Sequence, residues 1–97
     1  MSDKSSTVTD DMFETKERHR RYLRAVNNLV RRKILRSIDK GNSTVSAISE
    51  DVDLDSKSLK WHLSILIDGF CVEEKIEDDQ AKYLLTKEGK VVDFLDK

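Results

Sequence analysis

The chain has 97 residues, enough for one compact domain, and 38% of them are charged. No apolar run approaches the roughly 20 residues of a membrane span and no signal peptide opens the chain, so we expect a cytoplasmic protein with no membrane contact. The single cysteine excludes an internal disulfide, and two distant histidines leave little from which to build a catalytic or metal site. We therefore expect no enzyme, no metal and no cofactor.

Charge is distributed unevenly along the chain. Residues 16–40 contain ten Lys and Arg against two acids, whereas residues 41–97 contain seven Lys against thirteen acids. A basic block of this kind indicates an anionic partner. The alternative is a solvated helix that pairs with the acidic half of the same fold.

The first part of the chain is predicted to be a tail followed by two helices. Residues 1–10 are polar and lack periodicity, so we expect a disordered tail. A basic helix is predicted over residues 11–26. Asn28 can cap a second helix, in which apolar residues recur every three to four positions. Gly41 ends that helix, because glycine adopts the left-handed C′ conformation without strain.

Short elements are predicted after Gly41. We expect a strand stub at Ser43–Val45, a short helix at Ser46–Val52, and a longer helix at Ser56–Asp68 that Asp55 can cap and Gly69 closes.

A hairpin and a last helix complete the prediction. Phe70–Ile76 and Ala81–Thr86 are predicted to be two strands joined by a polar tip, and Thr86 can cap a final helix over residues 87–97. The predicted fold is mainly α with a small β-hairpin wing (α+β), which is a winged helix-turn-helix with extra N-terminal and C-terminal helices. Residues 11–97 form one domain.

Four segments, in order, resemble motifs of the ArsR-like winged-helix regulators. Residues 25–35 (AVNNLVRRKIL) are similar to an opening helix that reads A-L-A-N-P-x-R-x-x-I-L, and residues 54–63 (LDSKSLKWHL) to the recognition segment L-S-x-S-T-V-S-x-H-L. Residues 68–70 (DGF) match the E-G-L/I before the wing, and residues 84–89 (LLTKEG) resemble the L-T-x-x-G of many archaeal members. The resemblance implies an archaeal-type, DNA-binding transcription regulator.

The helix predicted at 56–68 has two different faces. At 100° per residue, Leu59, Leu63 and Leu66 share one face with His62, which we expect to be a structural core histidine. The opposite face carries side chains that can bond base edges or phosphates, and an exposed Trp of this kind usually marks an interface. We predict that this helix enters the major groove of double-stranded DNA, with the candidate DNA-binding residues Ser56, Lys57, Ser58, Lys60, Trp61 and Ser64.

Three more basic residues are candidate phosphate contacts: Arg31, Arg32 and Lys82. The resemblance leaves an alternative for the arginines, because Arg at this position in the family often forms an internal salt bridge. The wing is unusual, since residues 73–80 contain five acids and one lysine, and phosphates repel such a tip. Either Lys82 alone reaches the DNA backbone or the wing stays off the duplex.

Apolar residues at both ends of the chain indicate a homodimer, because a lone winged-helix core cannot cover them. ArsR-like proteins commonly pair through these two regions. The candidate dimerisation residues are Met12, Phe13, Tyr22, Leu23, Val92, Phe94 and Leu95. The alternative function is a winged-helix protein–protein interaction module that uses the acidic wing and the basic N-terminal helices.

Cys71 is predicted to be a small buried hydrophobe rather than a redox sensor, since Glu73 and Glu74 would raise the pKa of its thiol. Arsenic- and zinc-sensing ArsR-like proteins carry a Cys-rich motif on the short helix before the turn. Residues 47–51 of this chain contain neither Cys nor His, so we do not expect metal sensing.

Overall fold

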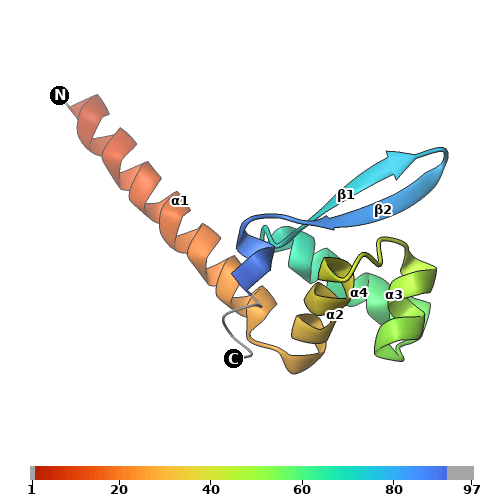
Figure 1. Ribbon diagram of the computed structural model, residues 1–97. Helices are drawn as coiled ribbons and strands as arrows, with labels where there is room; N and C mark the ends of the chain where they lie inside the picture. The colour runs from red at the N-terminus through yellow and green to blue at the C-terminus, as the bar shows by residue number, and fades with distance from the viewer. Residues whose placement is uncertain (1, 92–97) are drawn as a thin grey trace.

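Four α-helices, a β-hairpin and a short 3₁₀ helix make up the part of the chain that the structure describes. The computed structural model describes residues 2–91, and side chains from residue 14 to residue 90. The elements are α1 (Ser2–Val26), α2 (Leu29–Asp39), α3 (Val45–Val52), α4 (Ser56–Asp68), β1 (Val72–Glu77), β2 (Gln80–Leu85) and η1 (Glu88–Val91). In Figure 1, α1 projects from a body in which α2, α3 and α4 lie together below the hairpin. No described helix is long and apolar enough to cross a membrane.

The two ends of the described chain differ from the sequence prediction. Helix α1 begins at Ser2, whereas a disordered tail was expected up to residue 10. No Gly or Pro interrupts this stretch, so nothing in its sequence stops the helix from continuing toward the N-terminus. The expected C-terminal helix begins as the 3₁₀ helix η1, and residues 92–97 lie outside the described residues.

The expected strand stub at Ser43–Val45 does not form. Val45 opens α3, and the Thr44 hydroxyl accepts a hydrogen bond from the Ala47 N–H at 3.2 Å, which satisfies a backbone donor at the helix start. The Ser43 carbonyl accepts one bond from the Tyr83 N–H of β2 at 2.8 Å. A single bond ties this segment to the hairpin but does not make a third strand.

The two predicted caps of α2 and α4 are confirmed. Asn28 Oδ1 accepts from the Arg31 N–H at 3.0 Å, and Asp55 Oδ2 accepts from the Ser58 N–H at 3.0 Å. Each cap residue has extended backbone, as the N-cap position requires. Asp55 therefore marks where α4 begins.

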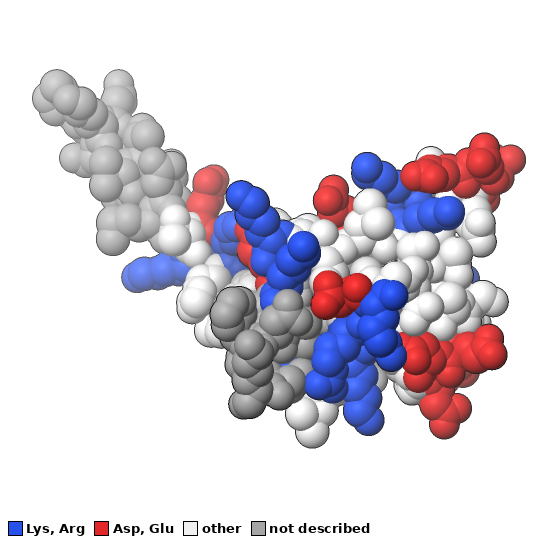
Figure 2. All heavy atoms as spheres, in the orientation of Figure 1, with Lys and Arg blue, Asp and Glu red and all other residues white. Residues whose placement is uncertain are grey.

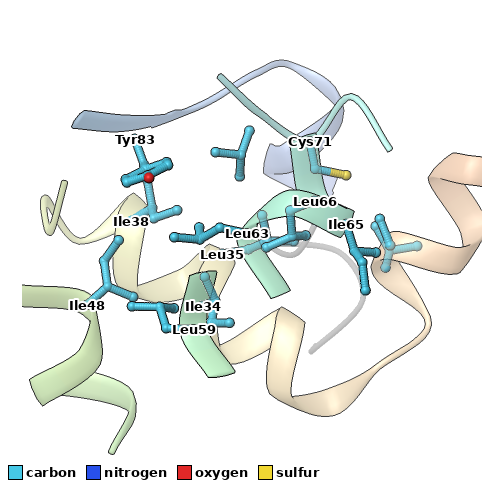
Figure 3. Close-up of a cluster of buried hydrophobic side chains, with 13 residues drawn as sticks. Ile34, Leu35, Ile38, Ile48, Leu59, Leu63, Ile65, Leu66, Cys71 and Tyr83 are labelled. Carbon is cyan, nitrogen blue, oxygen red and sulfur yellow. The ribbon is translucent and has the colours of Figure 1, made fainter. Parts of the chain in front are cut away.

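One apolar core joins the helices to the base of the hairpin. Figure 3 shows side chains from α2, α3 and α4 meeting Cys71 and Tyr83. The largest fully buried members are Ile34, Leu35, Ile48, Leu59, Leu63, Leu66 and Cys71. Burying each large aliphatic side chain contributes about 1.5–3 kcal/mol. This core holds α4 with one face inward and leaves the other to solvent.

The wing is a two-stranded antiparallel hairpin with a tight turn. Val72 pairs with Leu85 at its base, and Glu77 pairs with Gln80 at its end. Asp78 and Asp79 form the turn with φ of 51° and 63°, and positive φ at both central residues is what a type I′ turn requires. Asp tolerates this conformation better than most residues.

Two glycines allow close approaches that a larger residue would block. A Cβ on Gly69 would lie 2.5 Å from the Ala25 Cβ of α1, and a Cβ on Gly89 would lie 2.1 Å from the Cys71 carbonyl oxygen. Gly69 closes α4 as expected, with a φ of −89°, and Phe70 after it takes a positive φ. Gly69 thus lets α1 cross the end of α4, and Gly89 lets η1 pack on the base of the wing.

Candidate nucleic-acid interface

Helix α4 presents the two faces that its sequence predicts. Leu59, Leu63 and Leu66 are buried, whereas Lys57, Lys60, Ser64 and Trp61 are exposed. Trp61 is 58% exposed although it is the only tryptophan of the chain. The indole offers an apolar ring with one polar N–H, which makes the outer face of α4 the candidate contact surface.

Hydroxyl groups surround the start of α4. Ser56 is exposed and Ser58 is half-buried, so both lie at the surface where the sequence places them. The Ser64 hydroxyl donates to the Trp61 carbonyl at 2.6 Å and so stays close to the indole residue. The pKa of Asp55 is lowered, first by the Ser58 N–H that its carboxylate accepts, so this helix start carries a negative charge.

A groove of about 880 Å³ separates α3 and α4 from the hairpin. It was not predicted from the sequence, because its walls come from segments that are distant in the chain. Glu74 on its hairpin wall accepts a hydrogen bond from the Tyr83 hydroxyl at 2.8 Å. The lining includes the hydroxyls of Thr44, Ser46, Ser49, Ser56 and Ser64, with Glu50, Glu74 and Lys60 as its charged residues.

Arg31 is buried, which favours the internal alternative over a phosphate contact. Its side chain is 7% exposed, with Nε donating to the Ala25 carbonyl at 2.9 Å and Nη2 to the Arg24 carbonyl at 2.8 Å. Its Nη1 lies 3.2 Å from His62 Nδ1. The partners are helix-end carbonyls and an imidazole rather than the carboxylate of a salt bridge. Arg31 is therefore removed from the candidate phosphate contacts.

Arg32 keeps part of its surface while making a similar internal bond. Its Nε donates to the Val26 carbonyl at 2.8 Å, and the side chain is half-buried. Together with Arg31 it satisfies carbonyls at the C-terminus of α1, where a cation is also favoured by the helix dipole. Arg32 remains a candidate because its terminal nitrogens are not used by this bond.

The hairpin register adds a lysine that sequence reasoning missed. Lys75 of β1 lies directly opposite Lys82 of β2, and no carboxylate of the described residues forms an ion pair with either. Like charges directly opposite one another are unfavourable unless an anion neutralises them. Figure 2 shows basic residues on the hairpin, acidic residues at its far end, and further acids over α3. Only knowledge of the strand register would have revealed this pair.

The predicted dimerisation residues are only partly described. Tyr22 is half-buried and packs against the core, so it contributes to the fold of its own chain. Leu23 is 40% exposed on α1. The side chains of Met12 and Phe13 and the whole of Val92, Phe94 and Leu95 lie outside the described part.

Cys71 is fully buried, and burial raises the pKa of its thiol to about 11. Glu88 of η1 contributes to this shift, rather than Glu73 and Glu74 of the wing as the sequence suggested. Among the residues that the structure describes, no three His, Cys, Asp or Glu side chains come close enough together to hold a metal ion.

The arrangement of helices and hairpin is that of several bacterial proteins of known structure. NolR from Sinorhizobium fredii superposes with a TM-score of 0.71 at 26% identity, over 88% of this chain and 87% of that one. The transcriptional repressor BigR from Xylella fastidiosa gives 0.69 at 21% identity, over 90% of this chain and 91% of that one. The chain has the winged-helix fold. BpsR of Bordetella bronchiseptica, whose DNA binding is regulated by 6-hydroxynicotinic acid, gives 0.67 at 7% identity, over 93% and 70% of the two chains. No family model and no curated protein matches the sequence.

Proposed function

We propose that this winged-helix chain is a sequence-specific regulator of transcription that binds double-stranded DNA as a homodimer. The observation that carries the proposal is the outer face of α4, where Lys60, Trp61 and Ser64 are exposed in one stripe. A helix of this kind fits the major groove, in which Lys bonds guanine and Ser bonds either edge of a base pair. The similarity to the repressor BigR supports a regulatory rather than an enzymatic role.

The candidate residues divide into base contacts and phosphate contacts. Lys60, Trp61 and Ser64 are assigned to base edges because they lie on the face that enters the groove. Phosphates are assigned to the residues at the rim, namely Ser56, Lys57, Ser58, Arg32, Lys75 and Lys82. Only the first group carries sequence information, since phosphates are the same in every sequence.

Selection of preferred duplexes from random-sequence DNA by the purified protein tests this function. Lys60→Ala or Trp61→Ala should reduce the preference for the selected duplex over a random one by about 1–3 kcal/mol for each lost base contact. Lys90→Ala, which removes an exposed lysine of η1, is the control and should leave the preference unchanged. Failure to select any duplex, or full preference in both α4 variants, would contradict the assignment.

The homodimer is a separate part of the proposal, and it involves α1. Leu23 is exposed on a helix that projects from the body, and the equally exposed Leu84 lies on the wing. Leu23→Lys should shift the protein from dimer to monomer in sedimentation equilibrium at micromolar concentration, whereas Leu84→Lys should leave the mass unchanged. A wild-type monomer under the same conditions would overturn the dimer.

A second candidate function is a module that binds another protein through the acidic wing and the basic N-terminal helices. The observation in its favour is the row of exposed acids Glu77, Asp78 and Asp79 at the end of the hairpin. Salt dependence separates the two functions. A DNA binder releases counterions, so the logarithm of its affinity for duplex falls linearly with the logarithm of salt, with a slope of about −0.9 per phosphate contacted. A module that docks only on proteins should not bind the duplex, so no such salt dependence would be measured.

A further inference from the structure

Three helices meet at the guanidinium of Arg31. The side chain belongs to α2, bonds the carbonyls of Ala25 and Arg24 at the end of α1, and lies 3.2 Å from the imidazole of His62 on α4. Carbonyls in the last turn of a helix have no partner within that helix. Arg31 thus joins the end of α1 to the candidate recognition helix through one buried group.

The contact requires a neutral His62. A guanidinium has only donors, so Nδ1 must offer its lone pair and the imidazole proton must reside on Nε2. Protonation would place an N–H and a positive charge against the guanidinium. Burial, followed by the charge of Arg31, lowers the pKa of His62. Arg24 of α1 adds a second positive charge beside Arg31, and no carboxylate of the described residues forms an ion pair with the imidazole.

His62 also contacts the exposed tryptophan of the candidate interface. The rings of His62 and Trp61 lie edge to face, with centroids 4.9 Å apart and an interplanar angle of 68°. Such a contact between rings contributes about 0.5–1.5 kcal/mol and has a defined geometry. The placement of the indole therefore depends on the position of the imidazole, which in turn depends on Arg31.

We propose that Arg31 and His62 are a positioning pair, which fixes Trp61 and α4 relative to the end of α1 and makes sequence recognition sensitive to the protonation of His62. The inference rests on the proposed DNA-binding function and assigns neither residue to the DNA surface. With His62 neutral, the pair is intact. As the pH falls below the ordinary histidine range, protonation separates the imidazole from Arg31 and releases the indole.

Fluorescence of Trp61 tests the positioning part without DNA, because this is the only tryptophan of the chain. As the pH is lowered, the fluorescence emission of the wild-type protein should change in a single step. The midpoint of that step should lie below about pH 6.5, the ordinary pKa of histidine. His62→Gln retains a hydrogen-bond acceptor and cannot titrate, so its emission should be flat over the same range. His19→Gln is the matched control, since His19 is the other histidine and is exposed on α1. Emission that does not titrate in the wild type, or still titrates in His62→Gln, overturns the proposal.

Binding at two pH values tests the recognition part. The probe is the duplex that the wild-type protein selects from random-sequence DNA at neutral pH, compared with an unselected duplex. Between about pH 7.5 and pH 5.5, the wild-type preference should fall about fivefold or more, whereas His62→Gln should show the same preference at both values. Protonation adds positive charge, which raises the affinity for every duplex. Dividing the affinity for the selected duplex by that for the unselected one cancels this general gain.

Arg31→Lys gives an independent variant, because one ammonium group cannot replace three directed guanidinium contacts. Its preference should be reduced at neutral pH, whereas Lys33→Arg, which changes an exposed basic side chain of the same helix, should keep both the preference and its pH dependence. A selected duplex whose preference does not change with pH overturns this inference alone. If no duplex is selected, the proposed function fails and this inference fails with it.

Discussion

The acidic end of the wing offers a quantitative test of where the hairpin lies on DNA. Glu77, Asp78 and Asp79 are exposed, and both aspartates hold positive φ in the turn. Replacing all three with the matching amides removes their charge without straining the turn, because Asn tolerates the left-handed conformation as well as Asp does. Replacement with Lys would change charge and backbone preference together.

The expected gain in affinity follows from charge and distance. Two unit charges about 9 Å apart in water interact by about 0.5 kcal/mol, and physiological salt reduces this to about 0.2 kcal/mol. Each carboxylate of a wing beside the duplex faces several phosphates, since DNA carries one charge per about 1.7 Å of its axis. Three carboxylates therefore oppose binding by about 1.4 kcal/mol, so the triple amide variant should bind about tenfold more tightly.

Fluorescence anisotropy with labelled duplex, at low and at physiological salt, measures the change. The gain should be larger at low salt and should come mainly from faster association. Asp39→Asn, which removes an exposed carboxylate of α2, serves as the control outside the hairpin. An unchanged Kd would mean that the wing points away from the duplex. A weaker affinity would mean that the acids organise the site, and either result refutes the repulsion argument.

Further predictions concern the fold. Asn28→Ala should lower the free energy of unfolding by about 1 kcal/mol through loss of the α2 cap, as measured by urea denaturation. Gly89→Ala should destabilise the protein by about 1–3 kcal/mol, because its Cβ would overlap the Cys71 carbonyl, and Gly41→Ala, which meets no atom within 4 Å, provides a comparison limited to backbone strain at φ 114°. Because burial raises the thiol pKa of Cys71 to about 11, its contribution to stability is fully present below the pKa of the unfolded thiol and is lost as the pH rises from that value through about 11. A thiol reagent at about pH 8.5 should therefore label Cys71 only in denaturant, and rapid labelling of the native protein would contradict its burial.

The sequence predicted those parts of the fold that depend on neighbouring residues. The caps at Asn28 and Asp55 and the apolar stripe of α4 are local patterns, and each is confirmed. Gly41 has the positive φ expected of a helix-ending glycine. The outer face of α4 followed from the same stripe, because a helix with one buried side has a defined exposed side.

Features that depend on contacts between distant segments could not be predicted in the same way. Glycine is required at position 69 because a Cβ there would overlap Ala25 of α1, and not because of its φ. The sequence around Gly69 does not reveal that Ala25 lies beside it. The two roles left open for Arg31 were separated only by the carbonyls of α1 that lie around it. The Lys75–Lys82 pair required the strand register. In each case the missing information was the position of another element.

Helix α1 also affects how long an unassembled copy of the chain would survive proteolysis. Its basic residues from Lys16 to Arg24 are all exposed, and the helix extends away from the body. Arg18 and Arg21 are held to the body by ion pairs with Glu88 and Asp68, so local opening that exposes a site for a trypsin-like protease is easiest on their N-terminal side, at Lys16. Cleavage there would leave the core intact but remove the projecting arm. A partner that covers α1 would therefore protect the chain, and turnover would fall most heavily on copies that have not found one.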